Sequence, residues 1–434
     1  MRKKSLAFAS ILFCTVGGGL AQMPAGPEGQ SSTAQMLRPL TMIDALAKAE
    51  TANPMLQAKM AELAAAEGQR TDAAAWLYNN PQVSVDQRRR SVPQGAGTDR
   101  QSEWGAGLSQ TFEVAGQRGY RRESAEAALS ALRLEIADVR RQVRAEVSER
   151  YVRVLALQQR IELERQALGL FEDTATAVER RRAAGEDTRL DANVARVEAE
   201  RARNQLALVL EQLLDARTGL AAQLQLSPER LPLASGDLAA ERDGYSLETL
   251  LAAAQAQPRL RALAERENSA AARLKLERAS TYPDVTVGLN VGREGPGFAR
   301  ERLTTLSVSI PLPFFRRNAA GIGKASTELS QSQIEKQAGT RDAQANVTAL
   351  WARLNSLEVR VRRLQQSVLP ALQDNQQLSL KSQRAGQIGL LELIVVSRQG
   401  LDARRDLIEA LTDYQSTRIA LELAAGWPQE EARP

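Results

Sequence analysis

The sequence predicts a mainly α-helical protein with a small β part, in which one structural unit is written twice. Three observations predict this fold class: the two halves resemble each other at a nearly constant offset, each half contains a very long helical run, and each contains a pair of strand-like segments. In each half the expected order is a helix, two strands and then long helices. We therefore expect long antiparallel coiled-coil helices and four strands per chain.

The duplication is visible as short matching segments that follow one another in the same order. With offsets of 201 to 204 residues, the matches are Asn53–Leu56 with Gln257–Leu260, Pro81–Val85 with Pro283–Val287, Leu168–Gly169 with Leu369–Pro370, and Arg182–Gly185 with Gln383–Gly386. A repeat of about two hundred residues is too long for a solenoid unit. The sequence therefore predicts a tandem duplication.

The domain organisation follows from this repeat and from composition. The chain begins with Arg2–Lys4 and an apolar stretch, which is typical of a secretory signal cut after Ala21, so that Cys14 would be discarded. A segment rich in Pro, Gly, Ser and Gln follows. The expected boundaries are 1–21 signal peptide, 22–39 flexible leader, 40–226 first repeat, 227–257 connecting segment, 258–426 second repeat and 427–434 C-terminal tail.

Composition excludes several classes of function. The chain has 434 residues, 57 basic and 52 acidic side chains, one cysteine and no histidine. Without histidine there is no imidazole metal site, and the commonest general base is missing. The small net charge argues against a nucleic-acid partner, and there is no phosphate-binding Gly-rich motif. We expect no catalysis, no cofactor and no bound metal.

The helical run from Gln117 to Ala184 contains no proline and can remain helical for about 100 Å at 1.5 Å per residue. Its apolar stripe, with spacings of three and four, is Leu129, Leu132, Ile136, Val139, Val143, Val147, Tyr151, Val154, Leu157 and Ile161. The second half repeats it from Leu350 to Leu372. Such helices are too long for one small globule, so we expect an elongated bundle.

Four segments alternate between apolar and polar residues: one at Val83 and Val85, then Trp104–Val114, Val285–Val291 and Leu306–Leu312. We expect loops at Arg88–Ser102 and Arg293–Arg302. The remaining ends carry aromatic residues that could form a membrane-interface girdle, namely Trp76, Tyr78, Phe112, Tyr282, Phe314 and Phe315. A soluble two-sided sheet with aromatics in its core is the alternative.

Four membrane strands would leave two unpaired edges, which a bilayer does not tolerate. The strands must then be shared between chains. Two copies would give eight strands with a filled interior, and three would give twelve strands and a wider lumen.

With these features together, the chain resembles the TolC family of outer-membrane efflux ducts from about Leu40 to Gly426. Gln110–Arg118 and Pro311–Asn318 are similar to the CzcC branch, which serves cobalt, zinc and cadmium resistance, although that branch usually has an acidic residue in place of Arg316. The resemblance implies a homotrimer with a shared 12-stranded β-barrel and a helical tunnel through the periplasm. It also implies three partners: a periplasmic adaptor, an inner-membrane RND pump and outer-membrane lipid.

The resemblance also implies that the two helical turns form the periplasmic tips that dock the adaptor. The residues expected there are Gly185, Glu186, Asp187 and Leu190, with Gly386, Gln387, Ile388 and Leu390 in the second half. Asp191 and Glu392 occupy equivalent positions and are expected to form an acidic ring at the tunnel mouth. The alternatives are plain helix caps for the glycines and helix-start carboxylates for the acids. Some family members close this end of the tunnel with polar contacts that involve a Tyr and an Arg. The matching positions in this chain are Gln383 and Ile388, so those two residues are not present there.

The sequence thus predicts a passive outer-membrane duct of a Gram-negative cell, exporting heavy-metal cations received from a pump and adaptor. A multidrug or type I secretion duct of the same family is one alternative. A soluble periplasmic coiled-coil scaffold or adaptor is the alternative from a different class.

Overall fold

The computed structural model describes residues 39–94, 97–227, 229, 231–240, 246–295, 299–385 and 387–427. The predicted signal peptide, almost all of the leader and tail, and Gly386 lie outside these residues.

The described residues form nine α-helices, one π-helical turn and four strands, and the two halves present them in the same order. A short helix and a longer one precede each pair of strands, and a helical hairpin follows it. In the first half the helices are α1 (Met42–Ala52), α2 (Pro54–Ala74), α3 (Gln117–Ala183) and α4 (Arg189–Gln223); in the second they are α5 (Leu247–Gln255), α6 (Pro258–Ala279), α7 (Ala319–Arg363), α8 (Leu369–Arg384) and α9 (Leu390–Ala425).

Helix α3 confirms the prediction of one very long helix, since it runs without interruption for 67 residues. It begins after Gly116, whose φ of +77° suits glycine, and ends before the turn at Gly185. Of the predicted stripe, Val139 and Leu157 are partly buried, and the rest are buried: Leu129, Leu132, Ile136, Val143, Val147, Tyr151, Val154 and Ile161. The stripe is thus the surface against which the other helices pack.

The corresponding run in the second half is not one regular α-helix. A π-helical turn, Leu364–Val368, separates α7 from α8. It ends two residues before Pro370, which has no N–H to continue the α-helical hydrogen-bond ladder. The first half carries Gly169 at the equivalent position, and α3 continues through it.

The strands are β1 (Gln82–Gln94), β2 (Gly97–Phe112), β3 (Val285–Glu294) and β4 (Glu301–Ser309), and they form one antiparallel sheet in the order β1-β2-β3-β4. The prediction of a loop at Arg88–Ser102 was wrong, because these residues pair across the hairpin, Arg88 with Glu103 and Arg90 with Gln101. β4 ends at Ser309, earlier than predicted, since Pro311 and Pro313 cannot donate to a ladder.

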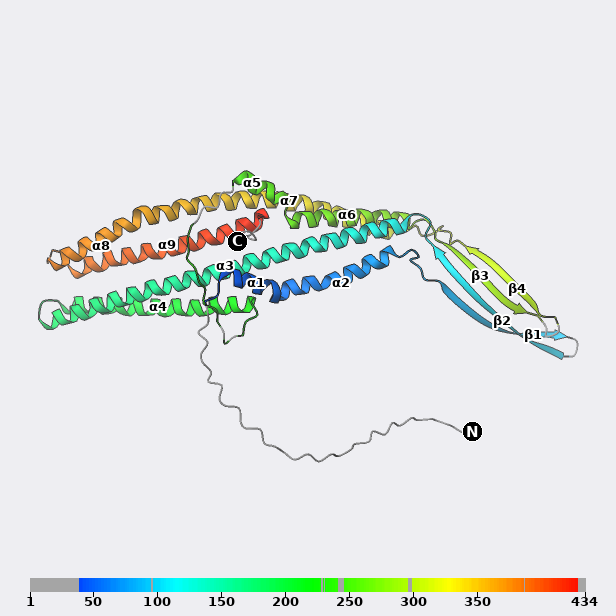
Figure 1. Ribbon diagram of the computed structural model, residues 1–434, viewed down its shortest axis with the longest axis horizontal. Coiled ribbons are helices and arrows are strands. Elements are labelled where there is room, and N and C mark those ends of the chain that lie inside the picture. The colour runs from blue at the N-terminus through cyan, green and yellow to red at the C-terminus, as the bar shows by residue number, and fades with distance from the viewer. Residues whose placement is uncertain are drawn as a thin grey trace, which may run out of the picture. The chain divides into compact units, whose positions relative to one another are not determined.

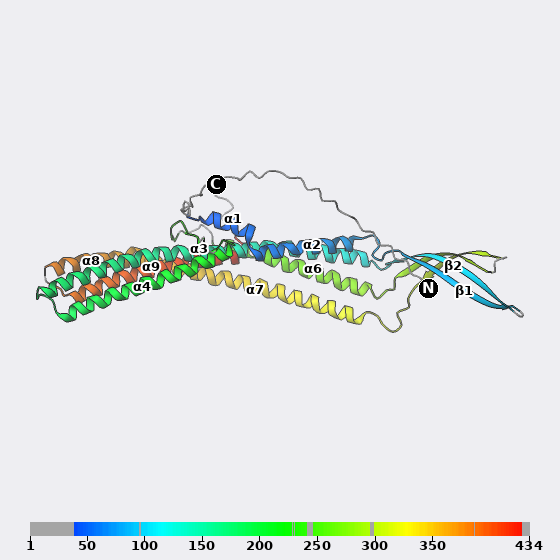
Figure 2. The same cartoon turned by 90° about the horizontal axis from the view of Figure 1, so that it is seen from below.

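Figure 1 shows the sheet beyond one end of α2, α3, α6 and α7, while the hairpins α3–α4 and α8–α9 end at the other. Figure 2 shows the same separation from a second direction. The turns that follow the strands and the turns that join the hairpin helices therefore lie far apart along α3.

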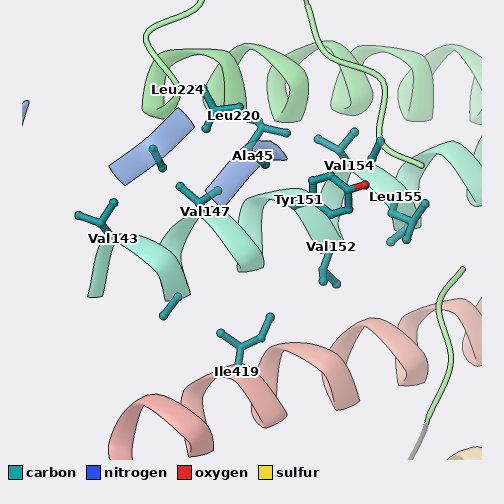
Figure 3. Close-up of a cluster of buried hydrophobic side chains, with 14 of the residues drawn as sticks. Ala45, Val143, Val147, Tyr151, Val152, Val154, Leu155, Leu220, Leu224 and Ile419 are labelled. Atoms are coloured by element: carbon teal, nitrogen blue, oxygen red, sulfur yellow. The ribbon is translucent and has the colours of Figure 1, made fainter. Parts of the chain in front are cut away.

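The largest buried cluster lies midway along α3 (Figure 3). There Val143 and Val147 face Ala45 of α1 and Leu220 of α4. The Tyr151 hydroxyl lies 2.7 Å from the Leu40 carbonyl and 2.6 Å from the Ser235 carbonyl, and accepts from the Ser235 N–H. Leu40 and Ala234 also form a parallel bridge.

Inside the predicted connecting segment, α5 was not expected from the sequence. It begins at a reciprocal cap between Ser246 and Thr249.

Candidate functional site

The turn between α3 and α4 reverses the chain at Gly185. Its φ is +82°, a conformation that costs a side-chain-bearing residue energy. The Glu186 N–H donates to the Arg181 carbonyl at 2.9 Å, and the Gly185 N–H donates to the Arg182 carbonyl at 3.0 Å. These two bonds form a Schellman C-cap, which explains why glycine stands here.

The turn between α8 and α9 repeats the first of these bonds. The Gln387 N–H donates to the Ser382 carbonyl at 2.8 Å, and Gln387 is the residue equivalent to Glu186. Gln387 is exposed, and Ile388 is half-buried. The equivalent glycine, Gly386, is outside the described residues, so its predicted role in docking stays a prediction.

Asp191 and Glu392, the expected acidic ring, both bond to the start of their own helix. The Asp191 carboxylate accepts from the Thr188 N–H at 3.1 Å and from the Thr188 hydroxyl at 2.6 Å. These bonds hold the pKa of Asp191 below its usual range. The Glu392 carboxylate accepts from the Gly389 N–H at 2.6 Å. Within one chain, both carboxylates therefore bond as helix-capping residues do. An acidic ring at the tunnel mouth would also need the carboxylates of further copies of the chain.

Next to the first turn, Arg181 pairs with two acidic neighbours. Its guanidinium lies 3.0 Å from Asp187 and 3.5 Å from Glu186. Asp187 is half-buried, and Glu186 is exposed. The two expected docking acids are therefore already partly neutralised within the chain.

Two exposed leucines stand at the tips of the two hairpins. Leu190 is 68% exposed and Leu391 is 55% exposed, and they are equivalent in the repeat. Sequence reasoning selected Leu390 instead, which packs against a buried cluster that includes Ile394 and Leu401. Adding the repeat offset of 201 residues to the position of Leu190 would have identified Leu391.

Behind the tips, apolar packing and buried ion pairs join the two hairpins. Phe171 of α3, Ala199 of α4 and Leu401 of α9 belong to one cluster. Next to it, the fully buried Glu164 of α3 lies 2.5 Å from Arg160 and 2.5 Å from Arg405 of α9.

Burial alone would raise the pKa of Glu164, but hydrogen bonds from Arg405 and Arg160 outweigh it and place that pKa below its usual value. A second pair joins Arg398 of α9 to Glu198 of α4. Sequence reasoning missed these contacts with α9, because nothing in the sequence matches Glu164 to Arg405 or Glu198 to Arg398, residues about two hundred or more positions apart.

The six expected girdle residues all stand where helices meet strands. Trp76 and Tyr78 lie between α2 and β1, Phe112 ends β2, Tyr282 lies between α6 and β3, and Phe314 and Phe315 lie between β4 and α7. All are exposed, from 38% for Phe112 to 98% for Phe315. The Arg121 guanidinium stacks 3.6 Å above the Tyr78 ring centroid. Many apolar side chains of the sheet are likewise exposed, including Val85 at 78% and Leu306 at 72%, whereas Val285 and Val287 are half-buried.

The sequence model of the outer membrane efflux protein family matches residues 45–224 and 250–427, most of the chain. The chain belongs to this family. It is therefore an efflux protein of the outer membrane. The match covers both helical hairpins and all four strands, so the tips and the sheet described above are features of a family member.

Two curated relatives share much of the sequence. The chain is 28% identical over 378 residues to the cobalt-zinc-cadmium resistance protein CzcC of Cupriavidus metallidurans, covering 87% of this chain and 86% of that protein. It is 26% identical over 298 residues to the pyoverdine export outer membrane protein OpmQ of Pseudomonas putida, covering 65% and 62%.

Solved structures share the fold. CusC aligns with a TM-score of 0.74 at 18% identity, covering 92% of this chain and 95% of CusC. The outer membrane protein VceC of Vibrio cholerae aligns with the same TM-score and identity, covering 89% and 96%. The predicted TolC-like fold is thereby confirmed.

Within the described residues, no three Asp, Glu, His or Cys side chains are grouped so that they could hold a metal ion. Among the helices that the structure describes, none combines the length and the apolar composition that a membrane-spanning helix needs.

Proposed function

We propose that the chain is one subunit of a passive trimeric duct that carries heavy-metal cations out of the cell. An adaptor and an inner-membrane pump deliver the cations to its periplasmic tips. The observation that carries the proposal is the four-stranded sheet, many of whose apolar side chains are exposed. Among the described residues, its outer strands β1 and β4 each pair with one neighbour only. Further copies would complete it, and three copies give twelve strands with an open lumen.

The metal assignment is supported by the relationship to CzcC across most of both chains. A duct does not need a metal site of its own, because the pump selects the substrate. The exposed tip residues Leu190 and Leu391, one on each hairpin, fit an adaptor that binds both equivalent turns. Burial of these apolar side chains against the adaptor would contribute to the docking affinity.

A strain that lacks this chain should become sensitive to Zn, Cd, Co, Ni and Cu salts and keep its tolerance of dyes, detergents and antibiotics. Restoring the full chain should restore metal tolerance. Unchanged metal tolerance in a strain without redundant ducts would contradict the proposal.

Export of an organic compound is the second candidate, favoured by the relationship to the pyoverdine exporter OpmQ. The same panel distinguishes the two, because sensitivity confined to organic compounds would retain the duct and remove metals as its cargo.

A further inference from the structure

The arginines of the sheet are divided between its two faces in a way that the efflux function does not require. Side chains alternate along each strand, so the register assigns every residue to one of two faces. One face carries the apolar residues, such as Val85 paired with Ala106, which is paired with Val291. We call it the apolar face, and the opposite one, which carries Asn290 and Thr305, the polar face.

Four arginines extend the apolar face towards the hairpin ends of the strands: Arg89, Arg100, Arg293 and Arg302. Arg293 pairs with Arg302 and with Trp104 in one row of the ladder. Arg89, paired with Ser102, and Arg100, paired with Ser91, follow in the next rows. Arg293 is half-buried and the other three are exposed.

The acidic residues of the strands all lie on the other face. Asp86, Glu103, Glu294 and Glu301 belong to the polar face by register. There Arg90 approaches Glu103 to 3.8 Å. On the apolar face, none of the four arginines forms an ion pair with another residue that the structure describes. A cationic row thus continues an apolar surface without a counter-charge among the residues whose side chains the structure describes.

The length of strand between the helices and the first arginine row is close to the height of the apolar band of a membrane barrel. From Phe112, next to the helices, to Trp104 in the first arginine row, β2 advances eight residues, about 27 Å at 3.4 Å per residue. A strand tilt of about 40° reduces this to roughly 21 Å along the membrane normal, and the apolar band of outer-membrane proteins is about 25 Å tall. The arginines thus begin where hydrocarbon gives way to headgroups.

We propose that Arg89, Arg100, Arg293 and Arg302 bind the phosphate groups of anionic lipids in the leaflet farther from the helices. This proposal rests on the proposed placement of the sheet in the outer membrane. Guanidinium groups bind phosphate by paired hydrogen bonds, and near a membrane each such contact raises affinity about fivefold. The site is a surface belt that holds lipid around the sheet.

The test uses the full chain, purified in a nonionic detergent, with diphosphoryl lipid A as the probe. Bound lipid is counted by native mass spectrometry. R293Q/R302Q should lower the affinity for diphosphoryl lipid A about 25-fold, and R89Q/R100Q should also weaken it. The matched control is R88Q/R90Q, which removes two positive charges from the polar face of the β1–β2 hairpin, the hairpin that also carries Arg89 and Arg100. This control should retain wild-type affinity.

Lipid A from which both phosphates have been removed should bind all these proteins equally weakly. Inorganic phosphate at the same phosphate concentration should displace none of the bound lipid. Equal affinity of wild type and R293Q/R302Q, an equal loss in R88Q/R90Q, or full displacement by inorganic phosphate would each overturn the proposal. These readouts do not depend on metal tolerance. A purified outer-membrane oligomer that fails only the lipid test would therefore leave the proposed efflux function in place.

Discussion

The buried carboxylate of Glu164 should hold the two helical hairpins together. Replacing it in Glu164→Gln removes the negative charge and one of the two acceptor oxygens. The 2.5 Å hydrogen bond from Arg405 Nη2 to Oε2 is lost, whereas the remaining amide oxygen can still accept from Arg160 and from Arg405 Nε. Removing one partner of a buried ion pair costs about 3–5 kcal/mol. We expect the lower end, about 3 kcal/mol, because Arg405 is a quarter exposed and keeps Asp402 at 2.8 Å.

The assay is thermal unfolding of the purified full chain. With an unfolding entropy of about 2.1 cal/mol/K per residue, the chain has roughly 0.9 kcal/mol/K, so the melting temperature should fall by about 3 °C. The matched control is Glu162→Gln, two residues away on the exposed face of α3, which should change it by less than about 0.5 °C. An equal shift in the two variants would refute the reasoning.

The stability difference between wild type and the same variant should depend on pH. Because the folded-state pKa of Glu164 is lowered, its stabilisation is present above its unfolded pKa and is lost as pH falls through the folded value. The stability gap between wild type and Glu164→Gln should therefore be constant from about pH 5 to pH 8 and shrink below about pH 4. A gap that persists unchanged to pH 2 would show that the carboxylate charge is not its source.

Three further predictions concern the tips. Thr188→Ala should cost about 1 kcal/mol by removing the cap of α4, measured as faster local hydrogen exchange in its first turn; unchanged exchange would contradict the capping role. A bulky or charged residue at Gly386 should abolish efflux while export and trimer formation survive, which metal tolerance and gel migration would report; full tolerance would remove the docking assignment. Asp at Leu190 and Leu391 together should weaken adaptor binding at least tenfold in a pull-down, whereas unchanged binding would exclude these leucines.

The parts of the fold that depend on periodicity could be predicted from the sequence. Helix α3 was foreseen almost to the residue because Gly116 and Gly185 bracket a proline-free run with one apolar stripe. The hairpin end of β1 and β2 was missed because arginines resemble a solvated loop. Main-chain pairing does not depend on side-chain polarity, and Arg88–Arg90 continue the ladder.

The site was predictable only in its local features. The equivalence of Gly185 with Gly386 located both turns, and the first is the expected αL glycine. The capping roles of Asp191 and Glu392 follow from their position three residues after Thr188 and Gly389. The contact of Glu164 with Arg405 could not be foreseen, since it depends on how α9 packs against α3.

The central claim is that separate chains complete the sheet, three to a ring. Cross-linking of edge strands tests it directly: Val85→Cys in β1 is combined with Leu306→Cys, Thr304→Cys or Val308→Cys in β4, in a chain whose own cysteine, Cys14, lies in the predicted signal peptide. Within one chain these strands are about 14 Å apart, across two intervening strands, whereas a disulfide needs Cα atoms within about 7 Å.

We predict that at least one pair forms a disulfide-linked ladder of dimer and trimer in outer membranes, ending at three chains. A ladder that continues beyond three, or monomers alone for all three pairs, would contradict the trimeric duct.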